Sequence, residues 1–318
     1  METVLITGGA GFIGSHISEQ LLKMGYRVIC FDNFDPYYSQ EIKKSNIRPV
    51  LHEDNYKLVY GDIRIQETLD YIFEDYDIDY IIHLAAKAGV RNSFLHPFDY
   101  NDVNINGTTS LLEKIRDISV KKFVFASSSS IYGSSNKLPY SEEEKCSPIS
   151  LYGVSKLTGE LLCKNYHENF GTKIVCLRYF TVYGPRQRPD MGIYKFVKSA
   201  IDKEQIDIFG DGNSERDYTY IDDIVDGTIK AMLSDLDFSI LNLGNSSTIS
   251  LNGLLNLIEE LLGSKINRNY VNFKKGDMWK TYADISKSRK MIGFDPGTDL
   301  KTGIGNFIKW YKQIYFTL

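Results

Sequence analysis

Cysteine is scarce in this sequence and follows neither a metal-binding nor a disulfide pattern. The 318 residues contain four cysteines, at positions 30, 146, 163 and 176. They form no C-x-x-C pair and have no histidine at metal-ligand spacing, so we predict no metal site. Scattered thiols of this kind are typical of a reduced, cytoplasmic protein.

Positive charge and long apolar runs are also lacking. The net charge of −4 leaves no basic surplus for binding nucleic acid or an anionic membrane. No apolar run is long enough to span a bilayer, and no charged-then-apolar leader opens the chain. With 42% hydrophobic and 25% charged residues, the composition is that of an ordinary soluble globular protein.

Short apolar stretches alternate with amphipathic ones over the first 180 residues. This alternation predicts an α/β fold, with a mostly parallel, doubly wound sheet that carries helices on both faces. We predict its buried strands at residues 3–7, 27–31, 57–60, 79–85, 121–127 and 173–180.

The rhythm weakens after residue 180, where loops rich in Gly, Asp and Pro separate the expected helices. These helices are predicted near 222–234, 251–262 and 299–314. No internal repeat or low-complexity linker divides the chain. We therefore expect the later part to pack on the sheet as a smaller lobe.

The first predicted strand runs into a glycine-rich loop, "TGGAGFIGSH", at residues 7–16. Gly8, Gly11 and Gly14 have the spacing that lets a backbone turn tightly and approach a pyrophosphate at the start of a helix. Glycine is common in any turn, so the pattern alone means little. Here a strand precedes the loop and an amphipathic helix follows it, which favours a dinucleotide site.

Two acidic residues follow the next strands. Asp32 closes the second strand, where a carboxylate binds the adenosine ribose and would repel a 2′-phosphate, so we expect NAD rather than NADP. Asp62 follows the third strand and is placed to meet the adenine edge. Both are also ordinary turn residues, in "DNFDP" and "YGDIR".

Tyr152 and Lys156 lie four residues apart in "YGVSK". On a helix this spacing puts both side chains on one face, where an ammonium favours the phenolate of a tyrosine whose pKa is otherwise about 10. Such a tyrosine is a general base at neutral pH. The same pattern occurs by chance on surface helices, and it gains meaning beside the glycine loop and the serine-rich "FASSSSIYG" at 125–133.

Together these motifs resemble the extended short-chain dehydrogenases/reductases that act on nucleotide sugars. The resemblance spans nearly the whole chain and rests on "TGGAGFIG", Asp32, "HLAA" (83–86), "SSSSIYG" (127–133), "YGVSK" and "LRYF" (177–180). It implies a Rossmann-type NAD-binding domain at 1–180 plus roughly 205–240. It also implies a smaller C-terminal α/β domain for the nucleotide sugar, at roughly 181–204 and 241–318.

The resemblance also implies roles for single residues. Tyr152 is the catalytic base, Lys156 its electrostatic partner and a ribose contact, and Ser128 the hydroxyl bonded to the reacting sugar oxygen. The implied NAD contacts are Gly8, Gly11, Phe12, Ile13, Gly14, Asp32, Asn33, Asp62, Ile63, Leu84, Ala85, Ala86, Lys156 and Tyr179.

The serine run discriminates among the reactions of this family. Sugar 4,6-dehydratases carry an Asp-Glu pair directly after the catalytic hydroxyl, where this chain has Ser129 and Ser130. The glutamate that decarboxylases place two residues before the Tyr-Gly pair is lacking as well. What remains is a 4-epimerase, in which Tyr152 removes the proton of the sugar 4-hydroxyl, hydride passes to NAD, and the 4-keto sugar turns over before taking the hydride back.

The segment after "LRYF" is similar to that of UDP-glucuronate 4-epimerases, because Thr181 opens "TVYGPRQRPDM". This similarity implies that Ser129, Ser130 and Thr181 hold the sugar carboxylate, with Arg188 at the pocket edge. The alternative is a 4-epimerase for UDP-glucose or UDP-N-acetylglucosamine, since these enzymes also have several serines here. A non-catalytic NAD-sensing regulator is less favoured, because such proteins typically lose the tyrosine or the lysine.

The second half should hold the uridine diphosphate. By resemblance Arg216 binds the diphosphate, Phe209 lies near the uracil and Asp277 holds the ribose, although the three are also readable as a surface charge, a core aromatic and a turn residue. The family further implies a homodimer built from the helix after Pro97 and the helix that carries Tyr152.

Overall fold

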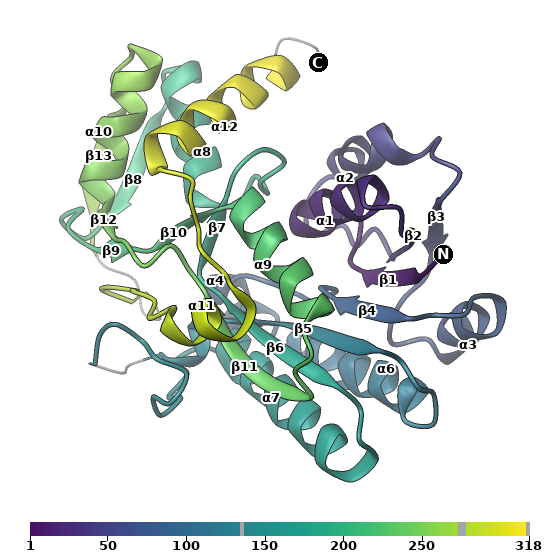
Figure 1. Ribbon diagram of the computed structural model, residues 1–318. Coiled ribbons are helices and arrows are strands. Elements are labelled where there is room, and N and C mark those ends of the chain that lie inside the picture. The colour runs from purple at the N-terminus through teal and green to yellow at the C-terminus, as the bar shows by residue number, and fades with distance from the viewer. Residues whose placement is uncertain (134–136, 273–277, 316–318) are drawn as a thin grey trace.

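The computed structural model describes residues 1–133, 137–272 and 278–315. Its centre is a parallel seven-stranded sheet with the strand order β11-β6-β5-β4-β1-β2-β3 (Figure 1). The strands are β1 (Thr3–Thr7), β2 (Arg27–Asp32), β3 (Tyr56–Tyr60), β4 (Tyr80–His83), β5 (Lys122–Ser128), β6 (Ile174–Tyr179) and β11 (Phe238–Leu243). The predicted α/β class and its six strands are confirmed.

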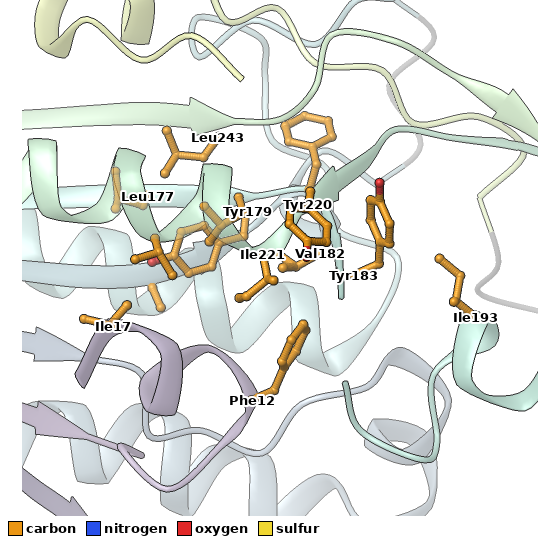
Figure 2. Close-up of a cluster of buried hydrophobic side chains, with 14 of the residues drawn as sticks. Phe12, Ile17, Leu177, Tyr179, Val182, Tyr183, Ile193, Tyr220, Ile221 and Leu243 are labelled. Atoms are coloured by element: carbon orange, nitrogen blue, oxygen red, sulfur yellow. The ribbon is translucent and has the colours of Figure 1, made fainter. Parts of the chain in front are cut away.

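Helices cover both faces of this sheet, because successive strand residues point to opposite sides. On one face Val4 and Val28 pack with Ile17 of α1 (Phe12–Lys23) and Ile224 of α9 (Ile221–Leu233). On the other, Leu5 packs with side chains of α3 (Gln66–Asp75), α6 (Thr108–Ile115) and α7 (Leu151–Phe170). Figure 2 shows part of the first cluster, where Phe12 and Ile17 lie close to Ile221 and Tyr179.

A second group of elements lies beside the sheet, toward the upper left of Figure 1. It pairs β7 (Thr181–Tyr183) with β10 (Tyr218–Tyr220), β9 (Glu215–Arg216) with β12 (Ile249–Ser250), and β8 (Gln205–Phe209) with β13 (Asn267–Val271). Its helices are α8 (Gly192–Asp202), α10 (Leu251–Leu262) and α12 (Leu300–Tyr315). The division into two domains stays a prediction; the pairings place β8 with this group and β11 in the large sheet.

The remaining elements are short and connect these layers. They are α2 (Gln40–Ile47), η1 (Arg48–Val50), α4 (Val90–Leu95), α5 (Pro97–Asn101), the π-helical turn η2 (Asp102–Gly107), η3 (Ser129–Ile131) and α11 (Ser286–Ile292). Across the described ranges, none of the helices combines the length and apolar character needed to cross a membrane.

Candidate active site

A cleft opens at the carboxyl ends of β1 to β5, the edge at which an open parallel sheet holds its ligands. Every residue predicted to contact NAD lines it, and so do Tyr152 and Arg188. The other lining residues include Asp35, Tyr37, Tyr38, Lys43, Lys87, Ala126 and Ser127. The predicted cofactor residues therefore lie around one cavity, together with Lys43 and Lys87, which the sequence motifs did not single out.

The glycine loop forms the floor of the cleft. Gly8 has a φ of +71°, and a Cβ there would lie 2.8 Å from the backbone nitrogen of Ala85, so only glycine fits. Helix α1 starts directly after the loop, with Gly11 at its N-cap and neither a side-chain cap nor an acidic residue in its first turn. Its first amides face the cleft with a positive dipole, which suits a phosphate group.

Asp32 lies at the end of β2, buried, with its carboxylate fixed by three donors. The amides of Phe34 and Ala10 donate to it at 2.8 and 3.1 Å, and the Lys43 ammonium contacts it at 3.2 Å. Lys43, whose side chain is only 9% exposed, belongs to no motif in the sequence. The Lys43 ammonium and the amide donors compensate the burial of the Asp32 carboxylate.

Asp62 is held in a similar way at the end of β3. Although its burial acts in the opposite direction, hydrogen bonds from Arg64 and from Asn33 lower the pKa of Asp62 to about 2. Asn33 Nδ2 donates to Asp62 Oδ2 at 2.8 Å, so these two predicted contact residues are joined across neighbouring loops. The pair presents a fixed set of polar atoms at the β2–β3 end of the cleft.

Tyr152 and Lys156 lie on the first turns of α7, where Ser150 caps the helix by accepting a hydrogen bond from the amide of Gly153 at 3.1 Å. Burial lowers the pKa of Lys156 to about 8, and its ammonium donates to the carbonyl of Ala126 at 2.7 Å. Burial raises the pKa of Tyr152, while the hydroxyl of Ser128 and the charge of Arg188 act to lower it. Arg188 is thus a cation that tunes this phenol from another loop.

The serine run divides into two sets by position. Ser127 lines the cleft and donates to Glu160, whereas Ser128 contacts the Tyr152 hydroxyl and accepts from the Ser130 amide at 3.1 Å. Ser128 and Ser129 are buried, and Ser130 is half-buried. Ser128 precedes the turn η3 and Ser129 and Ser130 lie on it, so the run adjoins the Tyr152 phenol through Ser128.

A network of buried hydrogen bonds and one ion pair connects α7, β6 and the residue that follows η3. Arg178 on β6 forms a two-pronged ion pair with Glu160 on α7, at 3.0 and 2.8 Å. Arg178 also donates to the Tyr132 hydroxyl at 2.9 Å, which donates to Asn242 at 2.7 Å. Because Glu160 follows Lys156 by one helical turn, the network fixes α7 against the sheet directly under the site.

Arg188 lies on the loop between β7 and α8 and is paired with Asp190, both contacts measuring 2.9 Å. The same loop is fastened to α1 at two points. Arg186 pairs with Glu19, and His16 Nε2 donates to the carbonyl of Pro185 at 3.0 Å. Burial and the nearby Arg186 lower the pKa of His16 to about 4, so this histidine is neutral at physiological pH.

Among the described residues predicted to bind the substrate, Arg188 lines the cleft, whereas Ser128, Ser129, Ser130, Thr181, Phe209 and Arg216 do not. Thr181 is half-buried at the start of β7, and Phe209 ends β8, where the guanidinium of Arg91 lies 4.3 Å from its ring centre. Arg216 on β9 donates to the carbonyls of Glu215 and Trp279 at 2.8 and 3.2 Å. Asp277 lies outside the described residues.

The order of these parts along the chain matches a known family. The family model for GDP-mannose 4,6-dehydratase matches residues 5–307, nearly the whole chain. The chain belongs to this family. It is therefore a member of the extended short-chain dehydrogenases/reductases, as its motifs predicted.

Individual relatives carry more specific names. A UDP-glucuronate 4-epimerase of Thermodesulfobacterium geofontis is 44% identical over 315 residues, which cover 98% of this chain and 97% of the relative. The crystal structure of UDP-glucuronic acid 4-epimerase from Bacillus cereus, in complex with UDP-glucuronic acid and NAD, is 37% identical with a TM-score of 0.93, covering 98% and 100% of the two chains. A UDP-glucose 4-epimerase of Thermotoga maritima, crystallised with UDP-glucose, is 33% identical with a TM-score of 0.91, covering 98% and 99%.

Proposed function

We propose that this protein is an NAD-dependent 4-epimerase that interconverts UDP-glucuronate and UDP-galacturonate. The observation that carries the proposal is the meeting of Tyr152, Lys156 and the dinucleotide-type glycine loop in one cleft. The names of the relatives support it, since they include UDP-glucuronate 4-epimerases and a structure holding both UDP-glucuronic acid and NAD. NAD fits the cleft because the uncapped start of α1 suits its diphosphate and the Asp32 carboxylate suits its ribose.

NAD, when bound, supplies the acceptor for the C4 hydride and later the donor. Tyr152 takes the proton of the sugar 4-hydroxyl and afterwards returns it, while Ser128, already bonded to the phenol, hydrogen-bonds the same sugar oxygen. Arg188 contributes positive charge that favours the phenolate, and Lys156 is proposed to do so from one helical turn away. Because Ser129 and Ser130 replace the acidic pair expected of a dehydratase, no acid stands ready there to eliminate water.

The uronate assignment rests on Arg188 and the hydroxyls of Ser129, Ser130 and Thr181. Arg188 lines the cleft, and Asp190 already binds its guanidinium fork with two hydrogen bonds. A sugar carboxylate has the same geometry as this aspartate, so it competes for the same fork. Neutral UDP-sugars have no carboxylate to place in this fork. A UDP-glucose or UDP-N-acetylglucosamine epimerase is the second candidate, because solved structures of similar proteins carry those names.

The first experiment is to incubate the purified protein, without added cofactor, with UDP-glucuronate, UDP-glucose and UDP-N-acetylglucosamine separately. We expect UDP-galacturonate as the product from UDP-glucuronate, without a pentose by-product, by chromatography. The Tyr152→Phe variant, purified identically, controls for a contaminating epimerase. Conversion of a neutral sugar only would contradict the uronate assignment, and no conversion even with NAD added would contradict the epimerase.

We also propose that the protein is a homodimer. Helices α5 and α7 carry apolar side chains that are exposed in the single chain, with Phe98 83% and Leu161 61% exposed. Two copies of this surface form a contact with twofold symmetry. Sedimentation equilibrium should give twice the chain mass of 36.3 kDa, and a Leu161→Glu variant should shift it toward the monomer. A monomer at micromolar concentration would contradict this proposal.

The four free cysteines accord with a reduced, cytoplasmic setting.

A further inference from the structure

An ion pair joins two loops at the rim of the cleft. The Lys87 ammonium lies 2.9 Å from Oδ1 and 2.8 Å from Oδ2 of Asp35, so both carboxylate oxygens share one cation. Asp35 follows β2 and Lys87 follows β4, and neither position belongs to the recognised cofactor motifs. Both residues line the cleft that contains the glycine loop.

The position of the pair follows from the strand order. Strand β1 lies between β4 and β2, so a bridge from the loop after β2 to the loop after β4 passes across the end of β1. The glycine loop begins at that end. The side chains of Lys87 and Asp35 are 18% and 24% exposed, whereas that of Asp32 is 4% exposed. The pair therefore lies at the rim of the cleft, above its buried floor.

Both partners are held in place by their own loops. Asn104 binds the backbone of Lys87 twice, at 2.7 and 2.9 Å, and donates to Ser155 Oγ on α7 at 2.9 Å. On the other side, the amide of Tyr37 donates to Asp35 Oδ1 at 2.9 Å. The backbone of Lys87 and the carboxylate of Asp35 are thus fixed, which limits the loop entropy that opposes closure of the bridge.

We propose that the Asp35–Lys87 ion pair is a latch that retains the dinucleotide in the cleft and sets its rate of release. This inference rests on the proposed function, in that it takes the ligand of the glycine loop to be NAD. A dinucleotide seated on the floor leaves past the rim, and the bridge must open before it does so. An enzyme that oxidises and re-reduces one substrate molecule with the same cofactor gains from a slow release of that cofactor.

The test measures loss of NAD from the purified holoenzyme. Wild type and the variants Lys87→Met and Asp35→Asn are loaded with NAD and dialysed, and the NAD that remains bound is quantified over time after heat release. We expect both variants to lose NAD about 3- to 20-fold faster than wild type. The charge-swapped double variant Asp35→Lys with Lys87→Asp should recover most of the retention, and circular dichroism verifies that each variant is folded.

A matched control comes from the neighbouring helix. Lys44 on α2 pairs with Glu41 at 2.7 Å on the exposed surface, with side chains 50% and 78% exposed, so Lys44→Met should leave the release rate unchanged. Release rates of Lys87→Met and Asp35→Asn equal to wild type would overturn the latch, and so would failure of the charge swap to restore retention. A wild-type protein that binds no NAD at all would overturn the proposed function itself, which separates the two failures.

Discussion

Replacement of Tyr152 by phenylalanine is expected to lower kcat for epimerisation by about 10²- to 10⁴-fold, because the phenol is the proposed group that moves the proton. The substitution removes one oxygen and keeps the ring, which contacts the edge of Tyr100 at a centroid distance of 6.2 Å. The fold and the bound NAD should therefore be retained. The measurement is the initial rate of UDP-galacturonate formation at saturating substrate, with bound NAD quantified in the same preparation.

Tyr166 offers a matched control for this variant. It lies on the same helix, and its hydroxyl donates to Glu113 far from the cleft. Tyr166→Phe should leave kcat within about twofold of wild type, because the hydroxyl that it removes belongs to a buried side chain that does not line the cleft. A Tyr152→Phe enzyme that keeps its NAD and more than a tenth of wild-type kcat would show that another group carries the proton.

Replacement of Glu160 by glutamine is expected to lower the free energy of unfolding by about 3–5 kcal/mol, because it leaves the charge of Arg178 buried without its partner. The two side chains are only 2% and 4% exposed. Glutamine keeps the volume, so packing loss does not account for such an effect. Urea denaturation followed by tryptophan fluorescence and circular dichroism measures it.

The control for Glu160 lies two turns further along α7. Glu168 and Lys164 form an ion pair at 3.7 Å with side chains 57% and 55% exposed, so Glu168→Gln should change stability by less than about 0.5 kcal/mol. Combining Glu160→Gln with Arg178→Met removes the orphaned charge and should recover part of the loss. Equal stabilities of Glu160→Gln and Glu168→Gln would contradict the structural role of the buried pair.

The regular part of the fold was predictable from local pattern. Each of the six predicted strands lies within two residues of an observed one, because β-branched and aromatic runs buried on both faces leave a strong signal. Strand β13 (Asn267–Val271) escaped prediction, since "NRNYV" has little apolar character and pairs with β8 from a distance of about sixty residues. The extended conformation of β13 therefore depends on its pairing with β8.

The candidate site shows the same division. Gly8, Asp32 and Tyr152 were predicted from motifs because their chemistry depends on short spacing along the chain. Lys43 and Lys87 were missed, because a lysine in sequence carries no mark of the carboxylate that it meets after folding. The influence of Arg188 on the Tyr152 phenol was missed for the same reason, since thirty-six residues separate them in the sequence.

The place of β11 at the edge of the large sheet has a consequence for synthesis of the chain. Strand β6 ends at Tyr179 and pairs on one side with β11, which ends only at Leu243. At typical elongation rates of 5–20 residues per second, the ribosome needs about 3–13 s to make the intervening residues. Throughout that interval the hydrogen-bonding edge of β6 is open, so the nascent protein carries a temporary aggregation hazard that the finished sheet removes.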